Sequence, residues 1–136
     1  MTENEIAKQI SDAAFVVHTK LGPGLLESVY EVILGYELQK RGLTTERQKP
    51  MPVVYDNIRF DEAFRSDLVV NGKVIAELKS VEALLPVHAK QLLTQLRLSG
   101  LKLGLLINFG EAHLKNGINR VINGRLDAEN PLQVSL

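Results

Sequence analysis

The chain has 136 residues, which fits one domain around a single core. Hydrophobic residues make up 45% of it, sixteen basic residues balance sixteen acidic ones, and the absence of cysteine excludes disulfides and thiolate metal sites. No apolar run is long enough to span a bilayer, and the polar, acidic start lacks the pattern of a signal peptide. We therefore expect no membrane partner and a cytoplasmic location. The zero net charge argues against a strong, nonspecific nucleic-acid binder, although a local basic stripe in the middle of the chain remains compatible with it.

Two helices are predicted in the first third of the chain. Thr2 and Glu5 have the spacing of a capping box, and apolar residues recur at helical intervals over residues 4–20. A Gly-Pro-Gly segment breaks this helix, and a second one follows over residues 25–41, where two cations and a glycine form a typical helix end. Its predicted core stripe consists of Leu26, Val29, Tyr30, Ile33 and Leu38.

Alternating apolar residues and turn signals predict strands in the middle of the chain. The predicted strands cover residues 51–55, 58–70 and 74–79. A helix over residues 86–99 and a buried strand over residues 103–107 follow. The segment 111–123 is compatible with a helix or with turns, and the polar tail 125–136 is expected to be loose. This order predicts a single α/β (α+β) domain with a core at about residues 5–122, in which helices flank a mixed four-stranded sheet.

Three charged residues on the second and third predicted strands form the main chemical signal. Glu77 and Lys79 point to the same face because side chains alternate along a strand. Asp67 precedes Glu77 by ten residues, so a strand–turn–strand unit would bring the two carboxylates together. Two carboxylates and an ammonium group at one sheet edge can hold a hard divalent cation and steer a water, as metal-assisted phosphodiester hydrolysis requires. The alternative is a solvated strand face, which buried neighbours make less favourable.

Two further polar residues are candidates for the same site. Glu27 falls in the first turn of the second helix, where a carboxylate is also favoured by the helix dipole alone. The spacing also allows Tyr30 to pack beside Glu27 or to donate a hydrogen bond to it. Gln91 lies on the helix after the third strand and could reach over the sheet, or could be an ordinary polar helix shoulder. The three histidines have no paired ligand spacing, so zinc is not expected.

Together these residues resemble the PD-(D/E)XK nuclease superfamily. Within it the chain looks like the small bacterial family named after its Gly-x-x-Glu-x-x-Tyr (GxxExxY) motif, here Gly24, Glu27 and Tyr30. The resemblance covers roughly residues 5–122 and implies a restriction-endonuclease-like core. Two positions depart from the pattern: Ser66 stands where the superfamily signature has proline, and Gln95 stands where the RecB-like pattern has tyrosine.

The resemblance implies a nuclease that uses Mg²⁺ or Mn²⁺ to hydrolyse DNA, with RNA as another possible substrate. It implies metal ligands at Asp67, Glu77, the main-chain carbonyl of Leu78 and, through water, Glu27. Lys79 would orient the attacking water, and Gln91 would hold Lys79 or a phosphate oxygen. The implied catalytic set is Glu27, Asp67, Glu77, Lys79 and Gln91.

Two other interpretations keep the fold without the chemistry: an inactive module that binds nucleic acid or protein, and a structural subunit in which the site is a remnant. The zero net charge favours them, and the intact set of carboxylates disfavours them. A homodimer is also expected, because the apolar segments 103–109 and 118–122 exceed what a small core is expected to bury.

Overall fold

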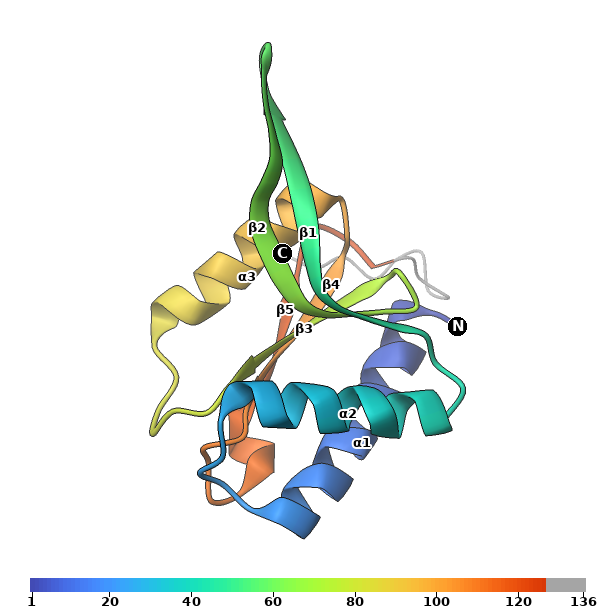
Figure 1. Cartoon of the computed structure of the whole chain (residues 1–136), viewed down its shortest axis with the longest axis vertical. Coiled ribbons are helices and arrows are strands. Elements are labelled where there is room, and N and C mark those ends of the chain that lie inside the picture. Colours follow the sequence, from blue (N-terminus) through green and yellow to red (C-terminus); the bar gives the residue numbers. More distant parts are fainter. Residues whose placement is uncertain (127–136) are drawn as a thin grey trace.

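A five-stranded mixed sheet organises the computed structural model, which describes residues 1–126 (Figure 1). The strands follow each other across the sheet in chain order, from β1 to β5. Neighbouring strands are antiparallel except β3 and β4, which are parallel and are joined by the crossover helix α3. The elements are α1 (Glu3–Leu21), α2 (Glu27–Lys40), β1 (Thr45–Tyr55), β2 (Ile58–Val70), β3 (Val74–Lys79), α3 (Pro86–Ser99), β4 (Leu103–Asn108), the short 3₁₀ helix η1 (Leu114–Gly117) and β5 (Ile118–Ile122).

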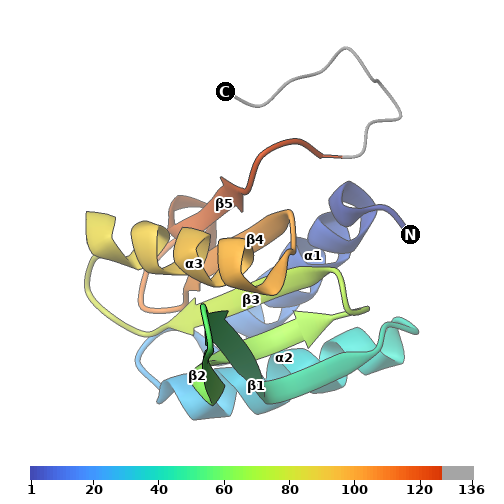
Figure 2. The ribbon, with the colours of Figure 1, turned by 90° about the horizontal axis from the view of Figure 1, so that it is seen from above.

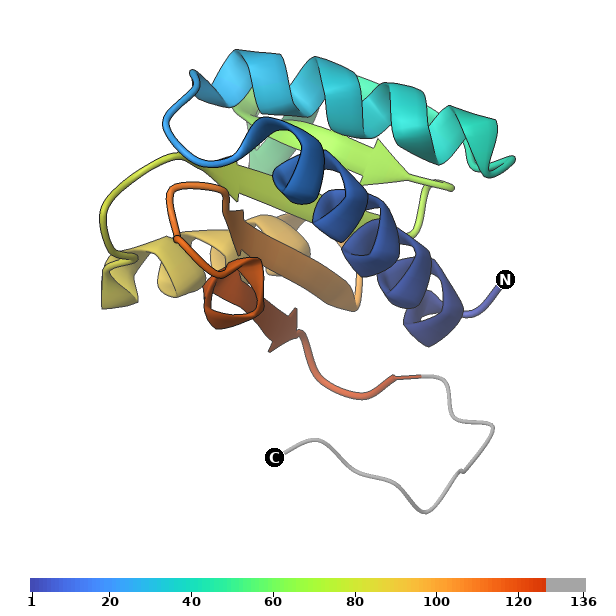
Figure 3. The same cartoon turned by 90° about the horizontal axis from the view of Figure 1, so that it is seen from below.

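Helices cover both faces of this sheet (Figures 2 and 3). The larger core lies beneath α1 and α2 and takes in Leu68 and Leu105 from the strands. The smaller core lies beneath α3 and takes in Val69 and Leu106. Adjacent residues thus serve opposite cores, as the strand period of two requires. Among the described residues, no helix is long and apolar enough to cross a membrane.

The two N-terminal helices form as their sequences predict, but the buried stripe of α2 differs from the predicted one. The capping box is present, since the Glu5 amide donates to Thr2 Oγ1 at 3.1 Å and the Thr2 amide donates to Glu5 Oε1 at 2.8 Å. Leu26, predicted to be in the core, is 74% exposed because it caps α2 from outside the helix. The buried stripe of α2 is instead Tyr30, Glu31, Leu34, Gly35 and Leu38.

The sheet is larger than the sequence predicts. β1 begins at Thr45 rather than residue 51, because this polar segment pairs with the buried end of β2, Thr45 lying opposite Val70. The ambiguous segment 111–123 contains η1 and then β5, which pairs antiparallel with β4 and adds a fifth strand. Most of the tail predicted to be loose, residues 127–136, lies outside the described part of the chain.

The apolar segments from which a dimer was expected are used by the chain's own core. Leu103, Leu105, Leu106, Ile107 and Phe109 are all at most 2% exposed. Ile118 and Ile122 pack against the same core. The fifth strand and the two layers of helices thus bury most of these apolar side chains within the chain itself.

Candidate active site

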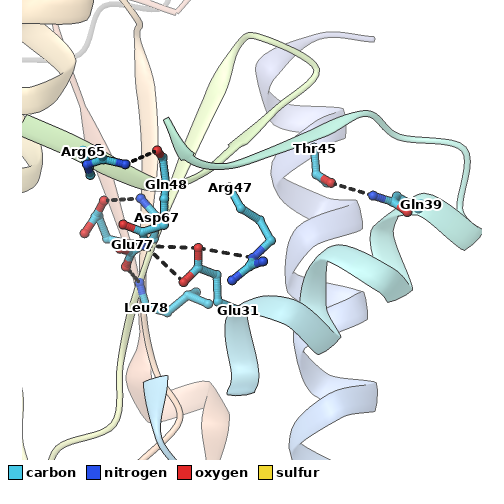
Figure 4. Close-up of polar contacts among 9 residues, drawn as sticks. All are labelled: Glu31, Gln39, Thr45, Arg47, Gln48, Arg65, Asp67, Glu77 and Leu78. Carbon is cyan, nitrogen blue, oxygen red and sulfur yellow. Dashed lines mark hydrogen bonds and ion pairs between the residues drawn. The ribbon is translucent and has the colours of Figure 1, made fainter. Parts of the chain in front are cut away.

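The candidate site begins where β2 and β3 stop pairing. The last backbone pair sets Leu68 opposite Ala76, and the next residues, Asp67 and Glu77, meet through their side chains (Figure 4). The Asp67 amide donates to Glu77 Oε1 at 3.1 Å, and the Leu78 amide donates to Asp67 Oδ2 at 2.9 Å. Each carboxylate therefore accepts a backbone N–H of the opposite strand, replacing ladder hydrogen bonds that would otherwise be lost in a buried place.

β2 twists at this point, so that its side chains change faces. The Ser66 hydroxyl donates to Gln95 Oε1 of α3 at 3.4 Å, whereas Leu68 belongs to the core beneath α1 and α2. Strict alternation would place Ser66 and Leu68 on the same face, so the strand twists between them. The twist lets Asp67 interact with residues of β1 and α2 as well as with β3.

Glu31, which no sequence motif singles out, lies next to this pair. Gln48 Nε2 donates to both carboxylate oxygens of Glu31 at 3.1 Å and to Asp67 Oδ1 at 3.3 Å. Arg47 Nε lies 3.5 Å from Glu31 Oε1 (Figure 4). The signal in the sequence was available: Glu31 is one turn after Glu27, on the side of the helix that carries Tyr30 and Leu34, and a buried charge needs partners.

Gln48 holds its position through an unusual backbone conformation. Its φ of 49° lies in the left-handed region, which few residues other than glycine adopt. Its carbonyl accepts a hydrogen bond from Arg65 Nη1 at 3.4 Å across the β1–β2 pair. The backbone thus aims the Gln48 amide between the carboxylates of Glu31 and Asp67, where it links helix α2 to strand β2.

Negative charge accumulates at this site. Burial, and then the Asp67 carboxylate, raise the pKa of Glu77 to about 8, while the Asp67 amide and the Lys79 ammonium act in the opposite direction. Burial also raises the pKa of Glu31, and the Asp67 carboxylate adds to this, while Gln48 and Arg47 oppose it. Crowded carboxylates with raised pKa values are the environment in which a bound cation is most stabilising.

Glu27 and Gln91 lie apart from this cluster. Glu27 is exposed at the first position of α2 and lines a shallow hollow with Ser28 and Ser80. Gln91 is exposed on α3, beside Gln95. Within residues 1–126, no hydrogen bond or ion pair joins either residue to Asp67, Glu77 or Lys79. Their roles in catalysis remain predictions.

The tyrosine of the motif serves the turn before α2. Tyr30 is fully buried; its hydroxyl donates to the Gly22 carbonyl at 2.6 Å and accepts from the Leu25 amide at 3.1 Å. Tyr30 thus bonds to this turn rather than to Glu27, and its ring stacks on Phe109 with centroids 4.4 Å apart. Ser80 Oγ also donates to the Leu25 carbonyl at 2.6 Å, which ties the start of α2 to the end of β3.

The donors at the site fit a hard divalent cation. Carboxylate oxygens are the ligands that Mg²⁺ and Mn²⁺ prefer, and Mg²⁺ is commonly held by one or two carboxylates together with water and substrate phosphates. Asp67 and Glu77 supply such a pair. Within the described part of the chain, no three acidic or histidine side chains are grouped closely enough to hold a metal by themselves. A cation here would therefore complete its coordination with main-chain oxygen, water or substrate.

Comparison with known families identifies the class of protein. Residues 4–121 match the PD-(D/E)XK nuclease superfamily. The chain belongs to this superfamily. The mixed sheet flanked by helices is its restriction-endonuclease-like core, as the sequence predicted, and the match covers most of the chain. Neither the curated proteins nor the solved structures give a match.

Proposed function

We propose that this nuclease-superfamily chain hydrolyses phosphodiester bonds in DNA with the help of Mg²⁺ or Mn²⁺. The family match supports the reaction class. The observation that carries the proposal is the interlocked pair of Asp67 and Glu77 beside the charge of Lys79. Besides accepting these backbone hydrogen bonds, the two carboxylates, of which Glu77 is buried, repel each other in the absence of a cation.

Each residue would have a distinct role in this reaction. Asp67 and Glu77 would hold the cation, with the main-chain carbonyl of Leu78 and, through water, Glu27. A bound divalent cation lowers the pKa of its water and neutralises charge on the phosphate. Lys79, whose ammonium group acts on the Glu77 carboxylate, orients the attacking water and stabilises the developing oxyanion.

The residues around this pair position it. Glu31 and Gln48 fix the orientation of Asp67 from the other side, as outer-shell partners of metal ligands commonly do. Gln91, exposed on α3, would contact a phosphate oxygen of the substrate.

We also propose that the chain belongs to the GxxExxY family. The hydrogen bonds of Tyr30 give the motif spacing a physical reason, because a tyrosine six residues after Gly24 can bond to the turn that leads into α2. Gly24 has a φ of +102°, which a residue with a side chain rarely adopts.

The cytoplasmic location remains a prediction.

The mode of DNA binding follows from the charge distribution. Several basic residues in the middle of the chain already have partners: Arg59 with Asp61, Arg65 with Glu62, and the Lys73 amine with a main-chain carbonyl. Substrate affinity should therefore depend on the bound cation and on the few remaining cations near the site. We expect weak binding without metal and a small salt dependence.

The test is a cleavage panel of single-stranded, duplex and branched DNA and RNA, with Mg²⁺, Mn²⁺ or EDTA. Asp67→Asn should abolish cleavage and weaken metal binding measured by calorimetry. Asp12→Asn is the matched control, because Asp12 forms only an exposed pair with Lys8 on α1 and should behave as wild type. Metal binding without cleavage of any substrate would favour the inactive binding module, and no binding at millimolar metal would contradict the proposal altogether.

A further inference from the structure

The outer half of the β1–β2 hairpin, residues 53–63, projects from the body of the protein (Figure 1). We call this segment the arm. β3 pairs with β2 only from Leu68 to Val70, so the arm is a ribbon of two strands with no third strand beside it. Two-stranded ribbons are marginally stable in water and are usually stabilised by packing against something else.

One face of the arm is apolar. Tyr55 pairs with Ile58 and Val53 pairs with Phe60, and side chains alternate along each strand, so these four side chains share one face. Tyr55 is 70% exposed, Ile58 57% and Phe60 55%. A contiguous patch of large exposed apolar side chains marks an interaction surface.

The edge of β1 next to the base of the arm is poorly suited to pairing with another strand. β1 is the outer strand of the sheet, and Pro50 and Pro52, which precede the arm, remove two backbone donors there. Within the arm, the exposed side chains of Tyr55, Ile58 and Phe60 make the apolar face the surface available to a partner.

The charge of the arm disfavours nucleic acid as that partner. Between residues 53 and 63 the only basic residue is Arg59, against three acidic ones, which leaves a net charge of −2. The acidic residues are Asp56, Asp61 and Glu62. A surface of this charge would be repelled by a phosphate backbone.

Helix α3 offers the complementary surface on the same chain. It carries Lys90 and Arg97 and no acidic residue, which gives it a charge of +2. Its exposed apolar residues Val87 and Leu98 are 46% and 47% accessible. Leu98 also lines a hollow between α3 and the base of the arm, together with Ala63, Phe64, Gln91, Thr94 and Gln95. The fourteen residues of α3 extend about 21 Å, close to the roughly 17 Å of a five-residue strand of the arm.

We propose that the apolar face of the arm docks on α3 of a second copy of this chain, each copy giving one arm and receiving the other. A two-fold axis makes such an exchange self-complementary, so that every contact occurs twice. Tyr55 and Phe60 still expose 70% and 55% of their surface, so each can bury more than half of the about 150–250 Å² that an aromatic residue buries in full. Each copy would bury surface on both its arm and its α3, and these two areas add toward the roughly 800 Å² that one partner buries in a standard interface. The proposal concerns assembly and does not depend on the proposed nuclease activity.

The first test measures the mass of the full-length chain by light scattering across the micromolar range. The wild type should be a dimer, and Tyr55→Ser should raise the dissociation constant about 30-fold or more, as loss of a central aromatic residue does. Tyr36→Ser is the matched control, because Tyr36 is also exposed, at 59%, but lies on α2. A wild-type chain that stays monomeric at all these concentrations would overturn the proposal. A chain that dimerises only when DNA is added would overturn it too.

A second test maps the contact without depending on a destabilising change. The chain contains no cysteine, so Phe60→Cys and Leu98→Cys can be made singly, purified and mixed under oxidising conditions. A disulfide between the two variants is the expected result, since it can form only when the arm of one copy meets α3 of another. Cross-linking of Phe60→Cys with itself alone would show arm-to-arm contact and would overturn docking on α3.

Discussion

Replacing Glu77 by glutamine should stabilise the metal-free protein at alkaline pH. The pKa of Glu77 is about 8 in the folded chain, against an ordinary value of 4.5, so between these values the folded state holds a proton that the unfolded state has lost. Stability therefore falls as pH rises through this window, by up to about 1.4 kcal/mol per pH unit. The raised pKa of Glu31 acts in the same direction. The total loss from pH 5 to pH 8 is on the order of several kcal/mol, a large part of the stability of a small domain.

Glutamine is a neutral substitute for the protonated acid. Its Oε1 can keep the hydrogen bond that the Asp67 amide donates, and its amide can donate to the Asp67 carboxylate. Glu77→Gln should equal the wild type near pH 5 and exceed it at pH 8 by about 2 kcal/mol or more in EDTA. Adding Mg²⁺ should reverse the order at pH 8, since a ligand that binds only the folded wild type stabilises it by mass action.

Urea unfolding followed by circular dichroism at pH 5, 6, 7 and 8 measures both effects. Glu82→Gln, at an exposed position in the loop after β3, is the matched control and should follow the wild type. If wild type and Glu77→Gln showed parallel stability curves from pH 5 to 8 in EDTA, the reasoning on the buried carboxylate pair would be wrong.

Four further substitutions test the roles of Lys79, Glu31, Glu27 and Tyr30. Lys79→Ala should keep Mg²⁺ affinity in calorimetry and lower the single-turnover cleavage rate by about 10²–10³, as loss of one oxyanion donor does; an unchanged rate would contradict its assignment. Glu31→Gln should lower metal affinity by about tenfold, as loss of an outer-shell partner does, because Glu31 is buried and linked through Gln48 to the site. Glu27→Gln, at an exposed position, should have a smaller effect in the same titration, and the reverse order would refute this ranking. Tyr30→Phe should cost about 1–3 kcal/mol in urea unfolding, since two backbone groups lose their partner, and a neutral result would mean that water replaces the hydroxyl.

Local patterns in the sequence were enough for most of the fold. The strand period of two, the Asn-Gly turn after β2 and the glycine after α3 each act over a few residues, so β2, β3 and α3 have the predicted bounds. The start of β1 could not be predicted from local patterns. Its first half carries no apolar alternation and becomes a strand only because the buried end of β2 lies beside it.

In the candidate site, too, some residues could be predicted from the sequence and others could not. Asp67, Glu77 and Lys79 lie on neighbouring strands joined by a short turn, so their proximity follows from spacing and side-chain period alone. Glu31 and Asp67 are linked through Gln48, a residue of β1 that has a positive φ and donates hydrogen bonds to both carboxylates. No local pattern encodes this approach.

The sequence by itself determined which residues carry charge on a buried strand and which segments are apolar. Only the tertiary structure decided what those segments pack against. The apolar residues around Leu105 and Ile118 pack in the core within the sheet and beneath the helices, whereas Tyr55 and Phe60 stay exposed because their hairpin extends beyond the helices that cover the sheet (Figure 1). The reason is physical: periodicity reports the face on which a side chain lies, and burial depends on which distant strand or helix reaches that face.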